Sequence, residues 1–291
     1  MRKKERTGWA RRAVALLLLA VFCAGAASAD GALRGYSKEE GYVYVRLGRY
    51  PQTEADDIQP ILWRVLAADG EKVFLLSEYV LFARALHTSL KDYRDELKGD
   101  FAGTELCEYL NGTFAERAFT PEERELLLPC GDYGKVFLVS LEDMKNRDIG
   151  LGTTHKGTNN LKKIAEDPGV RAWGTEWAIH DNGVPQAEYP NPRERVYGLA
   201  GERVTVEETR LYVFQAKYGS CSPWWARTQS KTDGRQAVAT KDGGQIGRLE
   251  VARDNIGVRP AVYLDLNAFE ITGGSGTLED PWMVGLKNGN Q

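Results

Sequence analysis

Residues 61–76 read ILWRVLAADGEKVFLL, in which two apolar runs, 61–66 and 72–76, flank the dipeptide Asp69-Gly70. Both runs are rich in residues that favour strands, and an Asp-Gly dipeptide between such runs is a strong signal for a tight β-hairpin. The sequence therefore predicts two antiparallel strands of one sheet here.

Further strands are predicted on both sides of this hairpin. Apolar runs typical of strands occur at residues 42–45, 135–139, 224–227, 237–240 and 258–266. The glycine-rich run at 273–277 is interpreted as a turn that leads to a last strand.

A helical region interrupts this series of strands. The apolar spacing over residues 104–114 is helical, and Thr120-Pro121-Glu122-Glu123 forms a capping box with proline at the first helical position. Ser140 and Asp143 are expected to cap a brief helix after the next strand. Two or three short helices beside several strands predict an α+β fold.

The densest turn-forming composition lies at about residues 147–222, where glycine and proline recur. We interpret this stretch as a long, partly irregular loop excursion. No internal repeat or low-complexity linker divides the chain, so a single domain is expected over residues 30–291.

Residues 1–29 have the layout of a signal peptide. Basic residues up to Arg12 precede an apolar run at 13–22, and small residues end in Ala27-Ser28-Ala29. The apolar run is shorter than the roughly 20 residues of a membrane-spanning helix, and no later segment is long and apolar enough to span a membrane. We expect cleavage near Asp30 and a protein that is secreted or in the cell envelope.

The charge of the chain excludes some classes of partner. The formal net charge is −3, and removal of the basic leader makes the remainder more acidic. This argues against non-specific binding to nucleic acid and against attraction to anionic lipid.

Seven short motifs follow one another over residues 47–261, and their order is more specific than any one of them. They are Leu47-Gly48-Arg49-Tyr50-Pro51-Gln52, Trp63-Arg64-Val65-Leu66, Leu75-Leu76-Ser77-Glu78-Tyr79, Tyr109-Leu110-Asn111, Lys135-Val136-Phe137-Leu138-Val139-Ser140, Trp224-Trp225-Ala226-Arg227 and Gly257-Val258-Arg259-Pro260-Ala261. In this order the chain resembles the bacterial domain of unknown function 6273.

That family is similar to the C-type lectin-like fold, which formylglycine-generating, sulfatase-modifying enzymes share. The resemblance implies a twisted antiparallel sheet and two helices that support a long surface loop region. The excursion at 147–222 falls where that fold varies most.

The resemblance also allows an enzymatic alternative, because formylglycine-generating enzymes hold copper between two nearby cysteines, and Cu(I) prefers thiolates. Here Cys221 stands alone in the C-terminal third, whereas Cys107 and Cys130 lie in the helical region. The required pair is not visible. Cys107 and Cys130 are interpreted either as buried small apolar residues or as one disulfide.

Other catalytic and metal-binding patterns are missing from the sequence. His87, His155 and His180 are far apart and form no zinc-binding pattern, and no serine lies in a nucleophile elbow. The tripeptides of calcium-dependent lectins do not occur. We therefore expect no cofactor, no metal and no catalysis.

Aromatic residues of the excursion are the first candidates for a binding surface. Trp173, Trp177, His180 and Tyr189 lie among charged and turn residues, where large rings make good contacts with sugars or proteins. The four-residue spacing of the two tryptophans also fits a buried helical stripe, and such spacing is more often core than cleft.

The C-terminal motifs hold the remaining candidates. Trp224 and Trp225 are strand neighbours that point to opposite faces, so at least one is core and Trp225 is the candidate for a ligand-facing ring. Arg227 is one candidate for the ligand-binding surface. The alternative is a structural role, in which its guanidinium holds loop carbonyls or a carboxylate in a fixed fork. Trp63, Trp224 and Arg259 are assigned to structural motifs.

These observations predict an exported, non-catalytic module that recognises a glycan or a protein surface through its loop region. One alternative is a formylglycine-generating-like or other oxidoreductase that uses a reactive cysteine, with Cys221 as the first candidate. Another is a structural protein of the cell envelope.

Overall fold

The computed structural model describes residues 32–152, 169–180, 195–197, 204–206, 221–241 and 244–287, with the backbone alone described in the third and fourth ranges. The predicted signal peptide, most of the loop excursion and Tyr189 lie outside these residues.

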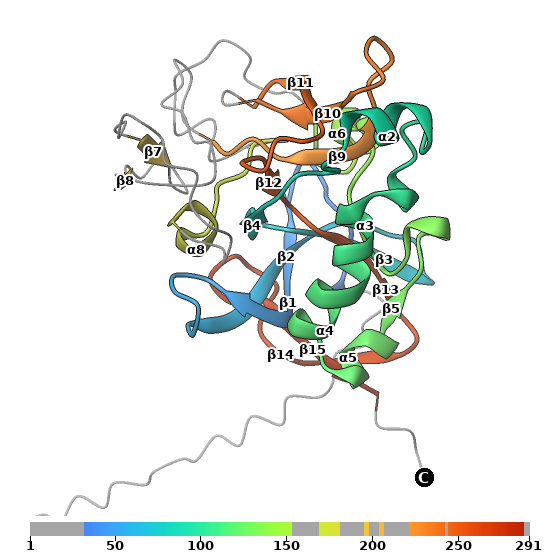
Figure 1. The fold of residues 1–291 in the computed structure, drawn as a ribbon. Helices are drawn as coiled ribbons and strands as arrows, with labels where there is room; N and C mark the ends of the chain where they lie inside the picture. The colour runs from blue at the N-terminus through green and yellow to red at the C-terminus, as the bar shows by residue number, and fades with distance from the viewer. Residues whose placement is uncertain are drawn as a thin grey trace, which may run out of the picture.

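One large sheet forms the centre of the described chain (Figure 1). Its strands run in the order β14 (Phe269–Gly273), β15 (Trp282–Leu286), β1 (Val43–Pro51), β2 (Ile58–Ala68), β3 (Lys72–Ser77) and β13 (Ala261–Asp265), and both β5 (Leu127–Leu128) and β6 (Val136–Phe137) pair with β13. The predicted hairpin is confirmed as β2 and β3. Gly70 adopts a φ of 89° in its turn, and the Asp69 carboxylate accepts from the Lys72 backbone N–H at 3.0 Å.

The sheet is mixed rather than wholly antiparallel. Strand β15 runs parallel to β1, with Val45 opposite Trp282, whereas the pairs β1–β2, β2–β3 and β3–β13 are antiparallel. The parallel pair arises because the C-terminal hairpin β14–β15 adds to the edge of β1, and an edge can accept a strand in either direction.

A smaller sheet packs above the large one in Figure 1 and contains β9 (Trp225–Gln229), β10 (Gln236–Thr240) and β11 (Ile246–Glu250). Two further pairs join β4 (Phe82–Ala83) to β12 (Gly257–Val258) and β7 (Arg195–Tyr197) to β8 (Val204–Val206). The strand predicted at 258–266 is therefore split into β12 and β13. The break falls at Arg259-Pro260, because proline has no N–H to donate to a sheet.

The predicted helices are present with the predicted caps. Helix α3 (Glu105–Tyr109), a π-helical turn (Leu110–Phe114) and α4 (Ala115–Ala118) follow one another without a break, and α5 (Pro121–Glu125) and α6 (Leu141–Lys145) begin at capping boxes. The described residues also hold α2 (Leu90–Asp95) and α8 (Glu176–His180), more than the two or three predicted. The Ser89 side chain, which accepts from the Asp92 N–H at 3.2 Å, marks the start of α2 and is readable in the sequence.

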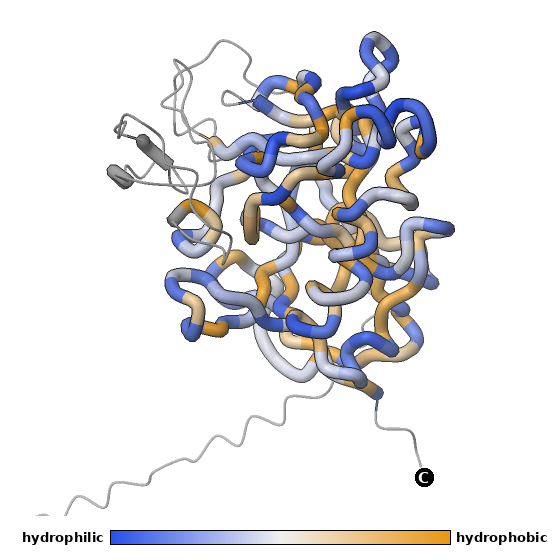
Figure 2. Tube along the Cα trace, in the orientation of Figure 1, coloured by the Kyte–Doolittle hydropathy of each residue, from blue (hydrophilic) through white to orange (hydrophobic). Residues whose placement is uncertain are grey.

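Both faces of the large sheet are buried at the middle of strands β2, β3 and β13. Val45, Trp63 and Val65 lie on the face that packs against α3 and α4, and Leu76 and Ala261 lie on the other face, within a second apolar cluster. Figure 2 shows the apolar segments inside and the polar ones around them. Because the sheet is covered on both sides, a polar side chain in its middle strands needs a buried partner.

The α+β class is confirmed by these mixed sheets and short helices. Among the described residues, none of the helices is long and apolar enough to cross a membrane.

Candidate functional site

The sheet register brings three charged side chains together on one face. Arg64 of β2 lies opposite Leu76 of β3, which in turn lies opposite Ala261 of β13. Glu78 follows the end of β3 and Arg259 precedes β13, and the ion-pair contacts of Glu78 with Arg64 and with Arg259 bring the three side chains together. We call Arg64, Glu78 and Arg259 the charge cluster.

Arg64 and Glu78 form a bidentate ion pair. Arg64 Nε donates to Glu78 Oε2 at 2.7 Å and Arg64 Nη2 donates to Oε1 at 2.6 Å, with exposed fractions of 0% and 5% for the two residues. Burial by itself raises the pKa of Glu78, but the charge and hydrogen bonds of Arg64 outweigh it, so this pKa lies below its usual value. The carboxylate therefore stays ionised inside the protein.

Arg259 is the less satisfied member of the charge cluster. Its Nε donates to the Ser77 carbonyl at 2.6 Å, and its Nη2 lies 4.0 Å from Glu78 Oε2. Neither Nη1 nor Nη2 has a hydrogen-bond partner among the described residues. Burial and the charge of Arg64 lower the pKa of Arg259 to about 9. Two cations thus share one carboxylate, which leaves one positive charge without a described counterion.

Tyr42 connects the charge cluster to the surface. The Arg64 guanidinium carbon lies 4.2 Å from the centre of the Tyr42 ring. The centres of the Tyr36 and Tyr42 rings lie 4.7 Å apart. The Tyr42 hydroxyl donates to the Gly150 carbonyl, and burial raises its pKa, so the donor proton is retained. The Tyr42 ring therefore contacts both Arg64 of the charge cluster and the Tyr36 ring, and we call it the wall.

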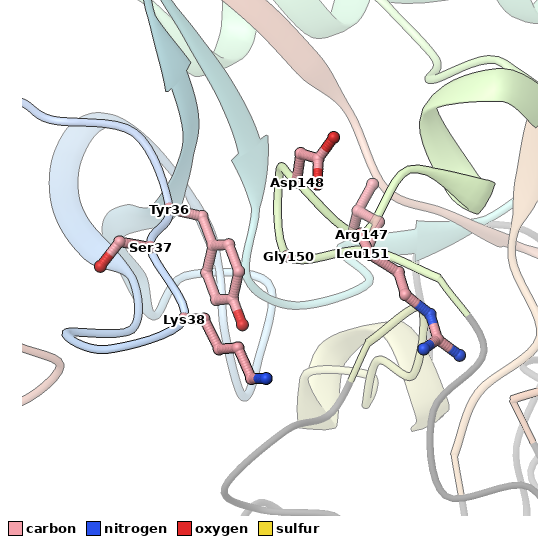
Figure 3. Close-up of a pocket in the computed structure, with 7 residues that line it drawn as sticks. All are labelled: Tyr36, Ser37, Lys38, Arg147, Asp148, Gly150 and Leu151. Atoms are coloured by element: carbon pink, nitrogen blue, oxygen red, sulfur yellow. The ribbon is translucent and has the colours of Figure 1, made fainter.

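A surface cavity of about 370 Å³ lies beyond this wall (Figure 3). Figure 3 shows that its two sides come from segments far apart in the sequence; the lining residues are Tyr36, Ser37, Lys38, Arg147, Asp148, Gly150 and Leu151. Lys38, Arg147 and Asp148 are exposed, and Tyr36 is half-buried. The cavity thus combines an aromatic ring with charged groups that water can reach.

The cavity and the charge cluster both contact described residues of the predicted loop excursion. Gly150 and Leu151 belong to the segment that enters the excursion. Past the first undescribed stretch, the Gly169 carbonyl accepts from Arg64 Nη1 at 3.5 Å and the Val170 carbonyl accepts from Trp224 Nε1 at 3.0 Å. Arg64 and Trp224 therefore contact the described chain after residues 153–168, and Tyr42 contacts it before them, at Gly150.

The tryptophans predicted for the binding surface are buried. Trp173 and Trp177 are 6% and 7% exposed and belong to the two apolar clusters on opposite faces of the large sheet. Helix α8 contains Trp177 but not Trp173, so the two do not share one helical stripe. Their burial favours the core alternative. The His180 side chain and Tyr189 lie outside the described residues.

Trp225 is also buried, and the expectation of a ligand-facing ring there is wrong. Trp224 and Trp225 do point to opposite faces, but each face carries its own apolar cluster, and both residues are fully buried. Trp225 Nε1 donates to the Arg84 carbonyl at 2.9 Å. Strands β9 and β10 of the small sheet are covered on both sides, which strand alternation alone does not reveal.

Arg227 and Trp63 hold the fold together. The Arg227 guanidinium donates to the Leu138 carbonyl and lies 3.5 Å from Asp143 Oδ2. These contacts match the predicted fork to a carbonyl and a carboxylate and lie away from the cavity lining. Trp63 is fully buried, and its Nε1 donates to the Leu47 carbonyl at 2.8 Å.

Cys107 and Cys130 are not joined, so the disulfide alternative is not realised. Burial raises the pKa of Cys107 to about 11 and also raises that of Cys130. Cys221 is buried, and its Sγ lies 3.6 Å from the Lys241 carbonyl oxygen. The part of the chain that the structure describes contains no group of three or more His, Cys, Asp or Glu placed to hold a metal.

The cavity and Glu78 were not among the site residues predicted from sequence. Arg64 carried a signal, because a charge inside the apolar run ILWRVL implies a buried partner. Tyr36 and Lys38 carried none, since they precede the first strand and meet residues 147–151 only in the folded protein.

In a comparison with family models, residues 70–266 match the model described as Domain of unknown function (DUF6273). Neither the curated proteins nor the solved structures gave a significant match.

Proposed function

This chain belongs to the DUF6273 family, and we propose that it is an exported, non-catalytic module that recognises a glycan at the root of its loop region. The observation that carries the proposal is the cavity, in which the half-buried Tyr36 ring lies among polar and charged side chains from two separate segments. The proposed site is therefore the cavity around Tyr36, and not the buried tryptophans expected from the sequence.

The chemistry of the cavity suits a sugar ring. The apolar face of a pyranose packs against an aromatic ring, while its hydroxyls need donors and acceptors around them. Lys38 and Arg147 supply donors, and Asp148 supplies an acceptor. A hollow of about 370 Å³ favours a compact ligand over a flat protein surface.

The rest of the proposal rests on sequence. The leader-like residues 1–29 support export to the cell envelope or the medium. The motif order supports the C-type lectin-like fold, in which a sheet and short helices carry a long loop region. The sheets and helices of the described residues are compatible with this finer assignment.

The cysteine-dependent oxidoreductase is the weaker alternative. The pKa of Cys107 is about 11, so the thiol stays protonated at neutral pH and is a poor nucleophile. Cys221 is 1% exposed and lies outside the cavity lining. Both cysteines contribute to apolar clusters, which is the ordinary role of a buried thiol.

The test is calorimetric titration of residues 30–291 with a panel of bacterial polysaccharides and their oligosaccharides. We expect saturable binding by the wild type, loss of binding in Tyr36→Ala, and retention in Tyr36→Phe, which keeps the ring and removes only the hydroxyl. Urea unfolding of each variant verifies that the fold is intact.

Two results would count against this function. Unchanged affinity in a folded Tyr36→Ala variant would remove the site from the cavity. Absence of binding to every polysaccharide in the panel would remove the glycan and leave a protein ligand or a structural role.

A further inference from the structure

We propose that the cavity is one end of a longer site, which binds a linear polysaccharide along the face of strand β1 that bears Tyr42, Tyr44 and Arg46. We call these three residues the β1 strip. The inference rests on the proposed function and adds that the ligand is a chain of several sugars. It is carried by the row of tyrosine rings that leads out of the cavity and by the solvent-accessible sheet face on which this row ends.

Side-chain alternation along β1 defines the strip. The odd-numbered residues of 43–47 are buried in the apolar cluster on the side of α3 and α4. Tyr44 and Arg46 therefore point to the opposite face of the sheet, and the contact between the Tyr42 and Tyr44 rings places Tyr42 there as well. Tyr42 and Tyr44 are half-buried, and Arg46 is exposed.

The tyrosine rings form a row that starts in the cavity, whose lining includes Tyr36. The ring centres of Tyr36 and Tyr42 lie 4.7 Å apart, and those of Tyr42 and Tyr44 lie 6.3 Å apart in an edge-to-face arrangement. The row thus leads from the cavity onto β1. Because each pyranose has an apolar face, rings placed in succession offer contacts to successive sugars of a chain.

Beyond Tyr44 the row reaches a part of the sheet that solvent can reach. Arg46 lies opposite Leu62 of β2 on one side and opposite Met283 of β15 on the other, so the three side chains share one face. Leu62 is half-buried, and Met283 is 46% exposed. This surface repeats the chemistry of the cavity, because it offers apolar contacts beside a guanidinium that can donate to sugar hydroxyls.

The turn that carries Tyr36 and Lys38 is held in place before any ligand binds. Ser37 and Gly41 exchange two backbone hydrogen bonds of 3.2 and 2.8 Å, and Arg34 Nη1 donates to the Gly41 carbonyl at 3.1 Å. The backbone of β1 is fixed by its pairing with β2. A chain that contacts both parts therefore gains from each of them at a small cost in ordering the protein.

The length of the strip favours a chain over a single sugar. Strand residues two apart are separated by about 7 Å, so Tyr42 and Arg46 lie about 13 Å apart along β1. A monosaccharide in the cavity cannot span this distance, whereas a linear oligosaccharide that starts in the cavity can follow the strand.

Chain length is the variable that tests the inference. Oligosaccharides of increasing length, prepared from a polysaccharide that the wild type binds, are titrated calorimetrically into residues 30–291. Affinity is expected to rise with length and then to level off, with the longest chains binding about tenfold more tightly than the disaccharide. Equal affinities at all lengths would confine the site to the cavity and overturn the inference.

Variants locate the added contacts. Arg46→Gln is expected to weaken the binding of the longest chains several-fold and to leave the disaccharide unaffected. Arg248→Gln, at an exposed arginine of β11 outside the strip, is the matched control and should change neither. Tyr44→Ala should lower the affinity for the longest chains about tenfold. If Tyr44→Ala does not fold, Met283→Ser at an exposed position tests the same end of the site, with a several-fold loss expected for long chains alone.

The outcomes separate this inference from the function on which it rests. If Arg46→Gln and Met283→Ser leave the affinity for long chains unchanged while Tyr36→Ala abolishes it, the longer site is overturned and the glycan function stands. Absence of binding at every chain length would overturn the glycan function and the longer site together.

Discussion

Arg64 and Glu78, 14 residues apart in the chain, are joined by two short hydrogen bonds of 2.7 and 2.6 Å in a nearly water-free interior. The same carboxylate also faces a second arginine, because Arg259 Nη2 lies 4.0 Å from Glu78 Oε2, the oxygen that accepts from Arg64 Nε. Glu78 is therefore the one described anion that makes two buried arginines tolerable, and several predictions depend on it.

Removal of the carboxylate should destabilise the fold strongly. Glu78→Gln leaves two buried guanidinium groups without a described counterion, and loss of one partner from a buried pair costs about 3–5 kcal/mol. Urea unfolding measures the effect. Glu116→Gln, an exposed position on α4, is the control and should stay within about 0.5 kcal/mol of wild type. A loss below about 1 kcal/mol in Glu78→Gln would mean that another anion neutralises the cluster.

The same pair predicts a pH dependence with a defined sign. The pKa of Glu78 is lower in the folded state than its usual value of 4.5. The stabilisation of the folded state by the ionised Glu78 carboxylate is therefore complete above pH 4.5. It is lost as the pH falls through the folded-state pKa. The stability difference between wild type and Glu78→Gln should narrow in acid, as measured by urea unfolding in a pH series. A difference that stays constant down to pH 2 would contradict this assignment.

Gly150 should not tolerate a larger residue, because the Tyr42 ring lies beside it. A Cβ at Gly150 would overlap the Tyr42 ring, and the residue has a φ of 78°. Gly150→Ala is expected to displace the wall between the cavity and the charge cluster, to cost about 1–3 kcal/mol and to abolish glycan binding. The control is Gly70→Ala, with a φ of 89° and open space around it, which adds backbone strain alone. Equal effects of the two substitutions on binding would show that the wall is unimportant.

Trp225 is predicted to stabilise the fold and not to bind a ligand. Its replacement by alanine should cost about 3–5 kcal/mol, because the ring is fully buried. Trp282→Ala, at a partly exposed ring on β15, should cost less. Thermal and urea unfolding test the order of the two variants. A Trp225→Ala protein of wild-type stability that had lost only ligand binding would restore this residue to the binding surface.

The thiols should differ in reactivity. Cys107 is buried with a pKa of about 11, whereas Cys130 is half-buried. Because the thiolate is the reactive form, iodoacetamide at pH 8 should alkylate Cys130 before Cys107, as followed by mass spectrometry of peptides. Mild oxidation should leave the two unlinked, and a Cys107–Cys130 disulfide in the folded protein would contradict the structure.

Local signals predicted much of this fold. Asp69-Gly70 specified the hairpin, and Thr120 and Ser140 specified helix starts, because a turn or a cap depends on only three or four neighbouring residues. Arg259-Pro260 shows the limit of such signals. The apolar run around it predicted one strand, but the missing proline N–H divides it between two partners.

The candidate site was less predictable than the fold. Trp225 was expected to face a ligand because strand neighbours alternate, yet alternation states only that two faces differ and not what covers each of them. The cavity depends on Tyr36 meeting Gly150, more than 100 residues apart in the sequence.

The family, the class of fold, the hairpin and the helix caps were all predictable from the sequence, because they depend on composition and on short-range contacts. The convergence of Arg64, Glu78 and Arg259 and the meeting of residues 36–38 with residues 147–151 around the cavity came from the tertiary structure alone. The physical reason is that strand register and the covering of each sheet face are set by contacts between distant segments, and these contacts determine which charges are desolvated together.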